Sequence, residues 1–389
     1  GRVPKDYDVA TDALPDAVRD LFGRRRTLAV GASFGVIVVV GTKQSGNIEV
    51  ATFRTEGPYA DGRRPDHVDF STPEEDAQRR DFTINGMFYD PIAEQVHDYV
   101  GGEADLAAGI VRAIGKPADR MSEDKLRLLR AVRFAATMDF ALDPKTAEAV
   151  RLQAHEIRIV SAERITQELQ KMLVDPHRRR AMDLARELGL LAEIVPELAP
   201  VISSTTVAET SPPEWAATLR RLQLLNEPVF ELAAAALLLA LPNSGAAATA
   251  ICKRLRMSND ETEAIGWLLQ HVAEVRASKT KSLAQLKRLL AHANALNVVE
   301  LARVDAMARD GDLSCVMHCE EILRQTPRER LDPPPLVTGD DLIALGLEPG
   351  RFFGQILDAV RDEQLNEKIT TKDEAMAFVR RFLDQHGTS

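Results

Sequence analysis

The chain has 389 residues, which is long for one domain and predicts roughly two to four. With 45% hydrophobic and 28% charged residues the composition is that of a folded protein, and no run of about 18 apolar residues predicts a transmembrane helix. The net charge of −10 argues against a nucleic-acid binder that relies on overall charge, and three cysteines argue against a disulfide framework. Because there is no signal peptide, we expect a cytoplasmic location.

The N-terminal part of the chain predicts a small α+β unit. Pro15 and Gly23 are typical of the start and end of a short helix over 12–23. Runs rich in β-branched residues predict strands over 27–32, 35–41, 48–56 and 93–102. The segment 57–76 is rich in glycine, proline and charge, so we expect a mobile loop there.

From about residue 104 the pattern becomes helical. Ser122 and Ser161 are expected to cap helices over 122–138 and 161–175. A proline-rich loop over 329–341 is expected to precede a tail subdomain. The predicted fold is therefore α+β: a small head with a mixed or antiparallel sheet, followed by a long all-α remainder.

Three acidic residues near the N-terminus could hold a metal ion. Asp6 and Asp8 are two residues apart, which on an extended backbone puts both carboxylates on one face. Glu49 lies within a predicted strand and could supply a third carboxylate, and such oxygen ligands suit Mg²⁺ and two-metal nucleotidyl transfer. The alternative is that Asp6 and Asp8 are turn residues and Glu49 faces solvent.

The segment RRDFTINGMFYDP (79–91) offers a second set of polar residues. Arg79, Arg80 and Asp81 are suited to bind a triphosphate and ribose hydroxyls. Equally, Asp81 could cap a short helix over 82–88 while both arginines face solvent.

The segment EDKLRLLRAVRF (123–134) places Asp124 and Arg127 three residues apart, as neighbours on one helix face if the segment is helical. A purely structural interpretation is that the two residues form an intrahelical ion pair. The functional one is a base-reading pair, because a carboxylate accepts from an exocyclic amino group and a guanidinium donates to a ring nitrogen. Cytosine and adenine present those groups, whereas uracil and guanine present a carbonyl beside an N–H.

Other polar clusters are less specific. Basic residues that could contact phosphates, or simply form solvated helix faces, include Arg178, Arg179, Arg180, Lys253, Arg254 and Arg256. Cys315, His318 and Cys319 resemble a zinc half-site, but no second cluster lies nearby in the sequence, so ordinary thiols are expected.

Five segments together resemble the ordered motifs of the bacterial-type (class II) tRNA nucleotidyltransferase/poly(A) polymerase family. They are KDYDVATDA, IEVATFRTE, RRDFTINGMFYD, EDKLRLLRAVRFA and SAERITQEL, and they cover about residues 1–175. Five linked motifs are specific where any one would be weak. The resemblance implies a nucleotidyltransferase head (1–115), a helical neck with a base-recognition motif (116–180), a helical tRNA-binding body (181–328) and a helical tail (329–389), in an elongated arrangement.

The resemblance also implies roles for individual residues. Asp6 and Asp8 match the metal-binding aspartates and Glu49 the third acid. The residues that match the nucleotide-binding motifs are Arg79, Arg80, Asp81, Asn85, Asp124, Arg127 and Arg130. Glu123 lies beside the base-recognition pair, and Glu163 with Arg164 matches a motif that braces the neck helices. The basic clusters at 178–180 and 253–256 would contact tRNA.

The activity implied is Mg²⁺-dependent addition of CMP and AMP, from CTP and ATP, to the 3′ end of tRNA. The alternatives are a poly(A) polymerase, an A-adding or CC-adding member, or a non-catalytic RNA-binding fragment or paralogue. The family's Gly-Gly turn before the DxD segment is not in this sequence, so we expect an N-terminally cut fragment. The oligomeric state is not predicted.

Overall fold

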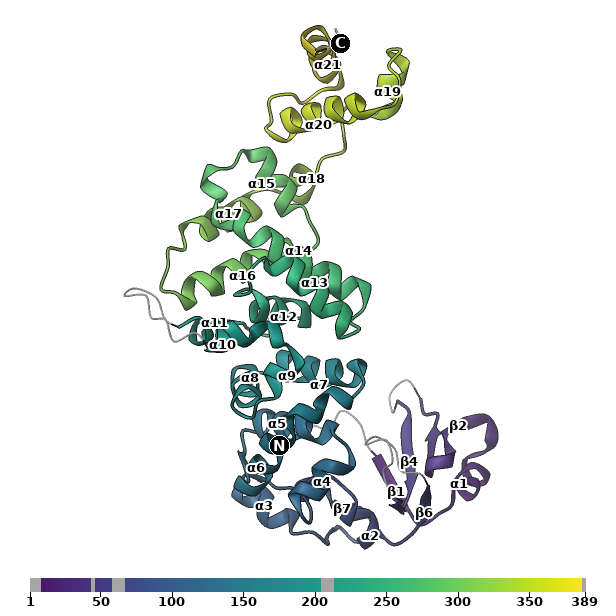
Figure 1. The fold of residues 1–389 in the computed structure, drawn as a ribbon. Coiled ribbons are helices and arrows are strands. Elements are labelled where there is room, and N and C mark those ends of the chain that lie inside the picture. The colour runs from purple at the N-terminus through teal and green to yellow at the C-terminus, as the bar shows by residue number, and fades with distance from the viewer. Residues whose placement is uncertain (1–7, 43–45, 58–66, 204–212, 387–389) are drawn as a thin grey trace. The chain divides into compact units, whose positions relative to one another are not determined.

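The computed structural model describes residues 8–42, 46–57, 67–203 and 213–386. The chain forms two compact units, Gly1–Pro200 and Val201–Ser389. All described strands lie in the first unit, and the second is helical (Figure 1). This distribution confirms the α+β fold class, with the sheets confined to the N-terminal part. Within the described ranges, none of the helices has the length and apolar character that crossing a membrane requires.

The first sheet is mixed, as predicted. Its strands are β1 (Asp8–Thr11), β2 (Thr27–Gly31), β3 (Val36–Val39) and β4 (Ile48–Thr52), in the order β1-β4-β3-β2. Neighbouring strands are antiparallel except for β1, which runs parallel to β4. Helix α1 (Pro15–Phe22) covers one face, where its Val18 packs into a small core; the core also contains Ile37, Val39 and Val50. Pro15 and Gly23 bound this helix as the sequence predicted.

The strand expected over 48–56 is interrupted at Phe53. After the break, β5 (Arg54–Glu56) pairs with β6 (Val68–Phe70) in a separate two-stranded sheet. The expectation of a loop over 57–76 is therefore wrong for its second half, because this half contains β6 and the first residues of α2 (Pro73–Gln78). Thr72 and Glu75 form a reciprocal capping box that starts α2. Residues 58–66 are outside the described ranges.

The helix considered over 82–88 is absent. Thr83–Asn85 form only a 3-10 turn, and β7 (Met87–Asp90) and β8 (Gln95–Asp98) follow as a hairpin. The reason is that backbone groups here bond across to a neighbouring segment: the N–H of Thr83 donates to the carbonyl of Arg112 at 3.0 Å, and that of Ile114 to the carbonyl of Asp81 at 3.1 Å. The backbone at this point is therefore extended, not helical.

The remaining elements of the first unit are helices and two short strands. They are α3 (Gly102–Ala108), β9 (Ile110–Val111), α4 (Pro117–Glu123), α5 (Leu126–Thr137), β10 (Ala141–Leu142), α6 (Pro144–Gln153), α7 (Ala162–Val174), α8 (Arg178–Glu187) and α9 (Leu190–Ile194). The next helix, α10 (Ala199–Ser203), includes the boundary at Pro200. Ser161 precedes α7 as predicted, although its side chain makes no capping hydrogen bond. The single helix expected over 122–138 is wrong: α4 ends at Glu123 and α5 begins at Leu126.

The second unit is a stack of helices with a buried ionic cluster. Its larger part contains α11 (Glu214–Leu224), α12 (Phe230–Leu238), α13 (Ser244–Arg254), α14 (Asn259–Arg276), α15 (Leu283–Leu290), α16 (Ala295–Ala308) and α17 (Ser314–Gln325). Asp305 on α16 accepts from Arg221 at 2.6 Å, from Arg276 at 2.7 Å and from Arg309 at 3.3 Å. The Arg221 side chain is fully buried, so the Asp305 carboxylate provides the charge that offsets it.

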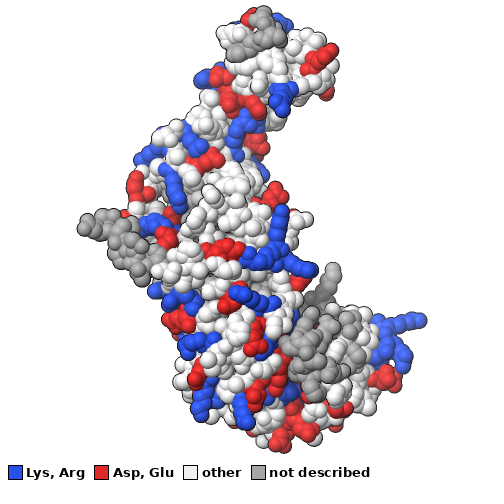
Figure 2. All heavy atoms as spheres, viewed as in Figure 1, with Lys and Arg blue, Asp and Glu red and all other residues white. Residues whose placement is uncertain are grey.

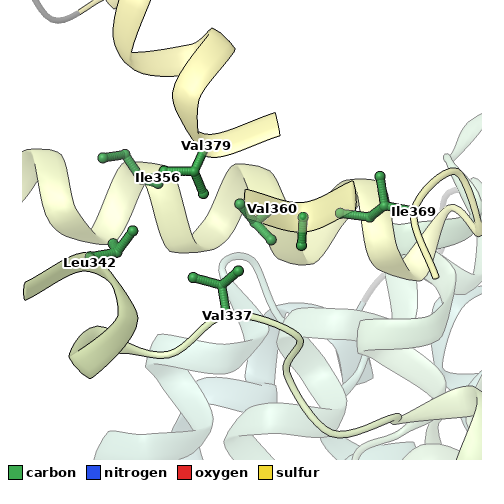
Figure 3. Packing of buried hydrophobic residues seen from close by; sticks show 7 residues of the cluster. Val337, Leu342, Ile356, Val360, Ile369 and Val379 are labelled. Atoms are coloured by element: carbon green, nitrogen blue, oxygen red, sulfur yellow. The ribbon is translucent and has the colours of Figure 1, made fainter. Parts of the chain in front are cut away.

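The C-terminal helices of this unit have a small apolar core of their own (Figure 3). After the short α18 (Arg328–Leu331) come α19 (Gly339–Ala344), α20 (Arg351–Leu365) and α21 (Lys372–His386). Leu342 of α19, Ile356 of α20 and Val379 of α21 meet in this core and are fully buried. Helix α20 also packs on α15, where Lys287 donates to Glu367 at 2.9 Å. The expected four-part division remains a prediction.

Candidate functional site

The strand register brings two of the predicted acidic residues together. Asp8 of β1 lies opposite Glu49 of β4 in the parallel pairing, and adjacent strands are about 4.8 Å apart. Because Val50 points into the core beneath α1, Glu49 and its register partner point to the opposite face of the sheet. Both acidic side chains are exposed. Asp6 lies outside the described residues.

This pair has the donor chemistry of a site for a hard divalent cation. Two carboxylates from neighbouring strands offer oxygen ligands of the kind that Mg²⁺ prefers. Within the ranges that the structure describes, no group of three potential ligands gathers at one point. The third predicted ligand, Asp6, is outside those ranges. The two acids that are described, Asp8 and Glu49, fit a metal site because they are carboxylates and share one face of the sheet.

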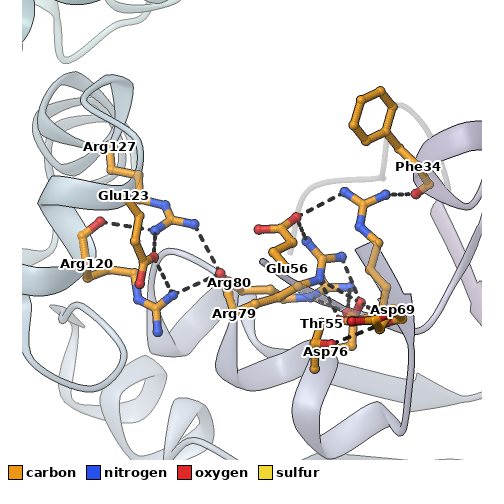
Figure 4. A network of polar contacts seen from close by, with 11 residues as sticks. Phe34, Thr55, Glu56, Asp69, Asp76, Arg79, Arg80, Arg120, Glu123 and Arg127 are labelled. Atoms are coloured by element: carbon orange, nitrogen blue, oxygen red, sulfur yellow. Dashed lines mark hydrogen bonds and ion pairs between the residues drawn. The ribbon is translucent and has the colours of Figure 1, made fainter. Parts of the chain in front are cut away.

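Arg79 is tied to protein carboxylates on several sides (Figure 4). Its guanidinium donates to Asp76 at 2.7 Å and to Glu56 at 2.8 Å, and its Nε donates to the carbonyl of Arg54 at 3.0 Å. Asp76 is almost fully buried. These bonds join the C-terminal end of α2 to β5, so in this structure Arg79 serves as a brace.

Arg80 is the more accessible of the two neighbouring arginines. Its side chain is 32% exposed, and it contacts Asp76 at 3.1 Å and the carbonyl of Asn85 at 3.0 Å. Its guanidinium also lies 4.7 Å from the centre of the Phe88 ring. Arg80 can therefore turn toward an anion at lower cost than Arg79, which has more bonds to lose.

Asp81 gathers Asn85 and Arg130, which the sequence had only placed in separate motifs. Its Oδ1 accepts from the side chain of Asn85 at 2.9 Å and from the N–H of Phe82 at 2.8 Å. Its Oδ2 accepts from Arg130 of α5 at 2.6 Å. Asp81 is buried, whereas Arg130 is 32% exposed. The cluster thus fixes the start of the predicted nucleotide-binding segment against α5.

Asp124 lies in the break between α4 and α5. Its backbone is extended (φ −135°, ψ 110°), and its Oδ1 accepts from the N–H of Leu126 at 3.0 Å. Arg164 of α7 donates to both oxygens of Asp124, at 3.1 and 2.7 Å. Asp124 and Arg127 are therefore not neighbours on one helix face, and the intrahelical ion pair considered as the alternative is wrong. The base-reading role of the two residues stays a prediction. The extended residue between the helices points the Asp124 carboxylate toward α7.

Arg127 pairs instead with Glu123, in a contact spaced as i and i+4 along the chain (Figure 4). It also donates to the carbonyl of Arg120 and to the carbonyl of Arg79, each at 3.0 Å. The residue is buried. Two guanidinium–carboxylate pairs, Arg164 with Asp124 and Arg127 with Glu123, therefore hold the segment for which base recognition is predicted.

Arg120 makes contacts with α2 that were not predicted from the sequence. It donates to the carbonyls of Gln78 at 2.6 Å, Arg79 at 3.1 Å and Ile114 at 3.2 Å, and to Glu123 at 2.8 Å. The first two carbonyls lie at the C-terminal end of α2, which favours a cation. The spacing of Arg120 and Glu123 signals an ion pair, but nothing local to the sequence signals the contacts with α2.

The predicted tRNA-contacting residues differ in accessibility. Arg178 is buried and donates to the carbonyl of Leu173 at 2.9 Å, so it belongs to the packing of α7 and α8 rather than to a face that RNA could reach. Arg179, Lys253, Arg254 and Arg256 are exposed. Arg180 contacts Asp139 and the carbonyl of Phe140. On the face drawn in Figure 2, Lys and Arg are interspersed with Asp and Glu.

Sequence models of three protein families match successive parts of the chain. The poly(A) polymerase head domain matches residues 1–112, and the "Probable RNA and SrmB- binding site of polymerase A" matches 139–202. The tRNA nucleotidyltransferase domain 2 matches 230–379. The three matches follow one another along the chain without overlap.

Individual relatives are similar over about half of the chain. A CCA-adding enzyme of Bacillus subtilis is 44% identical over 190 residues, which is 49% of this chain and 47% of the relative. One from Lactococcus lactis is 37% identical over 240 residues, or 59% of each chain. The chain thus spans about half to three fifths of the length of these curated relatives.

Solved structures extend the likeness to the whole chain. The CCA-adding enzyme of Bacillus stearothermophilus, crystallised in complex with CTP, has a TM-score of 0.77 and 28% identity, covering all of this chain and 91% of its own. A Thermotoga maritima CCA-adding enzyme complexed with tRNA has a TM-score of 0.63 at 17% identity, which shows the fold alone.

Proposed function

Because the chain belongs to the class II tRNA nucleotidyltransferase/poly(A) polymerase family, we propose that it adds CMP and AMP, from CTP and ATP, to the 3′ end of tRNA. The observation that carries the proposal is the register pairing of Asp8 with Glu49, whose exposed side chains share the face of the first sheet that is opposite α1. Template-independent addition would need a catalytic head for the phosphate chemistry and a protein segment that selects the base, and the proposal assigns these two tasks to the first sheet and to the segment around Asp124. A cytoplasmic location and Mg²⁺ as the ion are parts of the proposal.

The reaction joins the tRNA to the α-phosphate of the nucleotide. The 3′-hydroxyl oxygen attacks the α-phosphorus, the bond to the bridging oxygen of the β-phosphate breaks, and pyrophosphate leaves as the hydroxyl proton is lost. Members of this family depend on a metal ion, and Asp8, together with Asp6, would hold Mg²⁺ beside Glu49. When bound, this ion would lower the pKa of the hydroxyl and neutralise charge on the phosphates.

The chain's own residues would hold the nucleotide. Arg80, which is partly exposed, would bind the triphosphate, while Arg79 keeps α2 and β5 together. Ribose hydroxyls would exchange with the hydrogen bond between Asp81 and Asn85. Arg130 remains paired with Asp81 and would fix the carboxylate during that exchange.

Base selection follows from the hydrogen-bonding capacity that remains at Asp124 and Arg127. A carboxylate has about four acceptor sites. Arg164 uses one on each oxygen of Asp124, and the N–H of Leu126 uses a second on Oδ1, which leaves one on Oδ2. Asp124 can therefore accept one amino group of a base without releasing Arg164.

The count at Arg127 is complementary. Its guanidinium has five N–H donors. Within the described part of the chain three are used, toward Glu123 and the carbonyls of Arg120 and Arg79. The remaining donors could bond to a ring nitrogen. A base edge that reaches both the acceptor on Asp124 and a donor on Arg127 would suit cytosine and adenine, whereas uracil and guanine would be mismatched.

The test is to incubate the protein with tRNA that lacks its CCA end, Mg²⁺ and single or mixed nucleotides, and to measure product length. Growth by three residues only with CTP and ATP together supports the proposal. A long A tract with ATP alone would show a poly(A) polymerase and overturn it. No growth with any nucleotide, from protein that binds tRNA, would favour a non-catalytic RNA-binding protein.

A further inference from the structure

A hollow of about 840 Å³ lies between the C-terminal halves of α5 and α7, at the start of α8. It is lined by Arg133, Phe134, Thr137, Met138, Phe140, Lys171, Val174, Asp175, Pro176 and His177. Met138 and Val174 are 41% and 42% exposed, which is high for apolar side chains on packed helices. The volume is that of a pocket for one small molecule or nucleotide and is too small for a duplex.

The hollow carries more positive charge than its own carboxylates balance. Arg133 and Lys171 share one acceptor, the buried Glu168, at 2.5 and 3.1 Å. One carboxylate cannot neutralise two cations, and the Lys171 side chain is 56% exposed. Asp175, the carboxylate in the lining, accepts from the N–H of His177 at 2.8 Å and lies near the buried Arg178. In the lining itself, Arg133 and Lys171 therefore face one carboxylate, Asp175, before His177 is counted.

Flat and apolar surfaces lie beside these cations. The guanidinium of Arg133 stacks on the Phe134 ring at 3.9 Å from its centre, and Phe140, Met138 and Val174 form an apolar border. A cation for the phosphate next to flat apolar surface for the base is the combination with which proteins hold single-stranded nucleic acid. Phosphate ions alone would not require the apolar border.

We propose that this hollow binds one nucleotide of the acceptor strand of tRNA, with its phosphate on Lys171 and its base against Met138 and Val174. The proposal rests on the proposed function. Arg133 follows Arg127 by six residues on α5, which is a rise of about 9 Å along the helix axis. In a stacked strand, where successive nucleotides are about 3.4 Å apart along the axis, this length corresponds to about three nucleotides. The hollow therefore lies within reach of a strand whose 3′ end is at the base-recognition segment. Its α7–α8 side also falls within the part matched by the RNA-binding family model.

The experiment compares tRNA binding by Lys171→Ala, Met138→Glu and a matched control, Lys145→Ala, an exposed lysine on α6. Affinity for tRNA lacking CCA is measured without nucleotides at several salt concentrations. Lys171→Ala should weaken binding about 5- to 10-fold and reduce the slope of log K against log salt by about 0.7–0.9, because one phosphate contact is lost. Met138→Glu should weaken binding at least as much, and Lys145→Ala by less than about 2-fold.

The outcomes separate this inference from the proposed function. Wild-type affinity and salt slope in both hollow variants would overturn the inference, even if the protein adds nucleotides normally. Weaker binding in both, from protein that adds no nucleotides, would support the hollow as an RNA site and overturn the proposed function. Equal competition by inorganic polyphosphate and by RNA would overturn the inference, since polyphosphate offers charge without bases. Thermal melting confirms that each variant is folded.

Discussion

Replacing Arg164 tests whether the partner of Asp124 governs base selection. In the structure Arg164 holds both oxygens of Asp124, and the two side chains are 24% and 17% exposed. A charge-assisted pair of this kind contributes about 1.5–3 kcal/mol when shielded, and the partial exposure reduces this to about 1–2 kcal/mol. Arg164→Ala should therefore lower the stability of the protein by about that amount.

The same change should blur the choice of nucleotide. Without Arg164 the Asp124 carboxylate loses its fixed direction, so the advantage of an amino group over a carbonyl at the base edge shrinks. A loss of about 1.4 kcal/mol corresponds to about tenfold. We therefore expect the ratio of CMP to UMP incorporation to fall about tenfold. Arg164→Lys should be intermediate, since lysine keeps the charge but cannot bond to both oxygens in the same way.

The assay is single-turnover incorporation of CMP and of UMP into tRNA lacking CCA, combined with thermal melting. The control is Arg158→Ala, which removes a pair at 2.7 Å between an exposed arginine and the half-buried Glu193 in the same unit. It should change stability by less than about 1 kcal/mol and leave selectivity unchanged. If Arg164→Ala melts earlier yet discriminates between CTP and UTP as the wild type does, the orientation argument is refuted and Arg164 has only a structural role.

Three further predictions concern the acidic pair, the buried ionic cluster and a thiol. Asp8→Ala should abolish addition, measured by product length, without lowering the melting temperature by more than about 2 °C, because the side chain is exposed; wild-type rates would contradict the metal role. Asp305→Ala should cost about 3–5 kcal/mol in urea unfolding because the fully buried Arg221 loses its nearest carboxylate and keeps Thr218 and the more distant Glu214, whereas Asp310→Ala, which removes an exposed pair, should cost less than about 1 kcal/mol; equal losses would contradict this reasoning. Burial alone would raise the pKa of Asp305, but the hydrogen bond from Arg221 and the nearby arginine charges lower it overall. The ionised Asp305 therefore contributes its full stabilisation above an unfolded pKa of about 3.9, and this contribution is lost as pH falls through the lower folded pKa. When the free energy of unfolding is measured against pH, this group should cause no loss of stability above about pH 5. Burial raises the pKa of Cys252 to about 11, so Cys252 should resist alkylation at pH 8 until the protein unfolds, and rapid labelling of the native protein, read by mass spectrometry, would be inconsistent with that.

The acidic pair shows how far local sequence patterns reach. Glu49 could be singled out because an acid within a run of β-branched residues is unusual, and the strand over 48–52 was predicted from its composition. The parallel register with Asp8 could not be, because the order of strands in a sheet depends on contacts between distant segments. The shared face of the two acids is therefore a result of the structure.

The segment around Asp124 shows the opposite case, in which a local pattern misled. Residues 123–134 carry helix-favouring side chains and no glycine or proline, so an unbroken helix was the reasonable prediction. The break is stabilised by Arg164, which is 40 residues further along the chain. Arg178 is similar: a run of three arginines resembles a solvated face, yet the fold buries the first of them against the end of α7.

The junction held by Arg120 has a consequence for which substitutions the protein can tolerate. Arg120 donates hydrogen bonds to the backbone carbonyls of Gln78 and Arg79, and Arg127 also donates to the carbonyl of Arg79. Every amino acid presents the same carbonyl, so this contact places no constraint on the side chain of Gln78. The Gln78 side chain itself makes a separate bond, to the carbonyl of Tyr99 at 3.3 Å, which leucine or alanine at this position would lose. Variation among related sequences should therefore be broader at position 78 than at Arg120, and a saturation library would show the same difference.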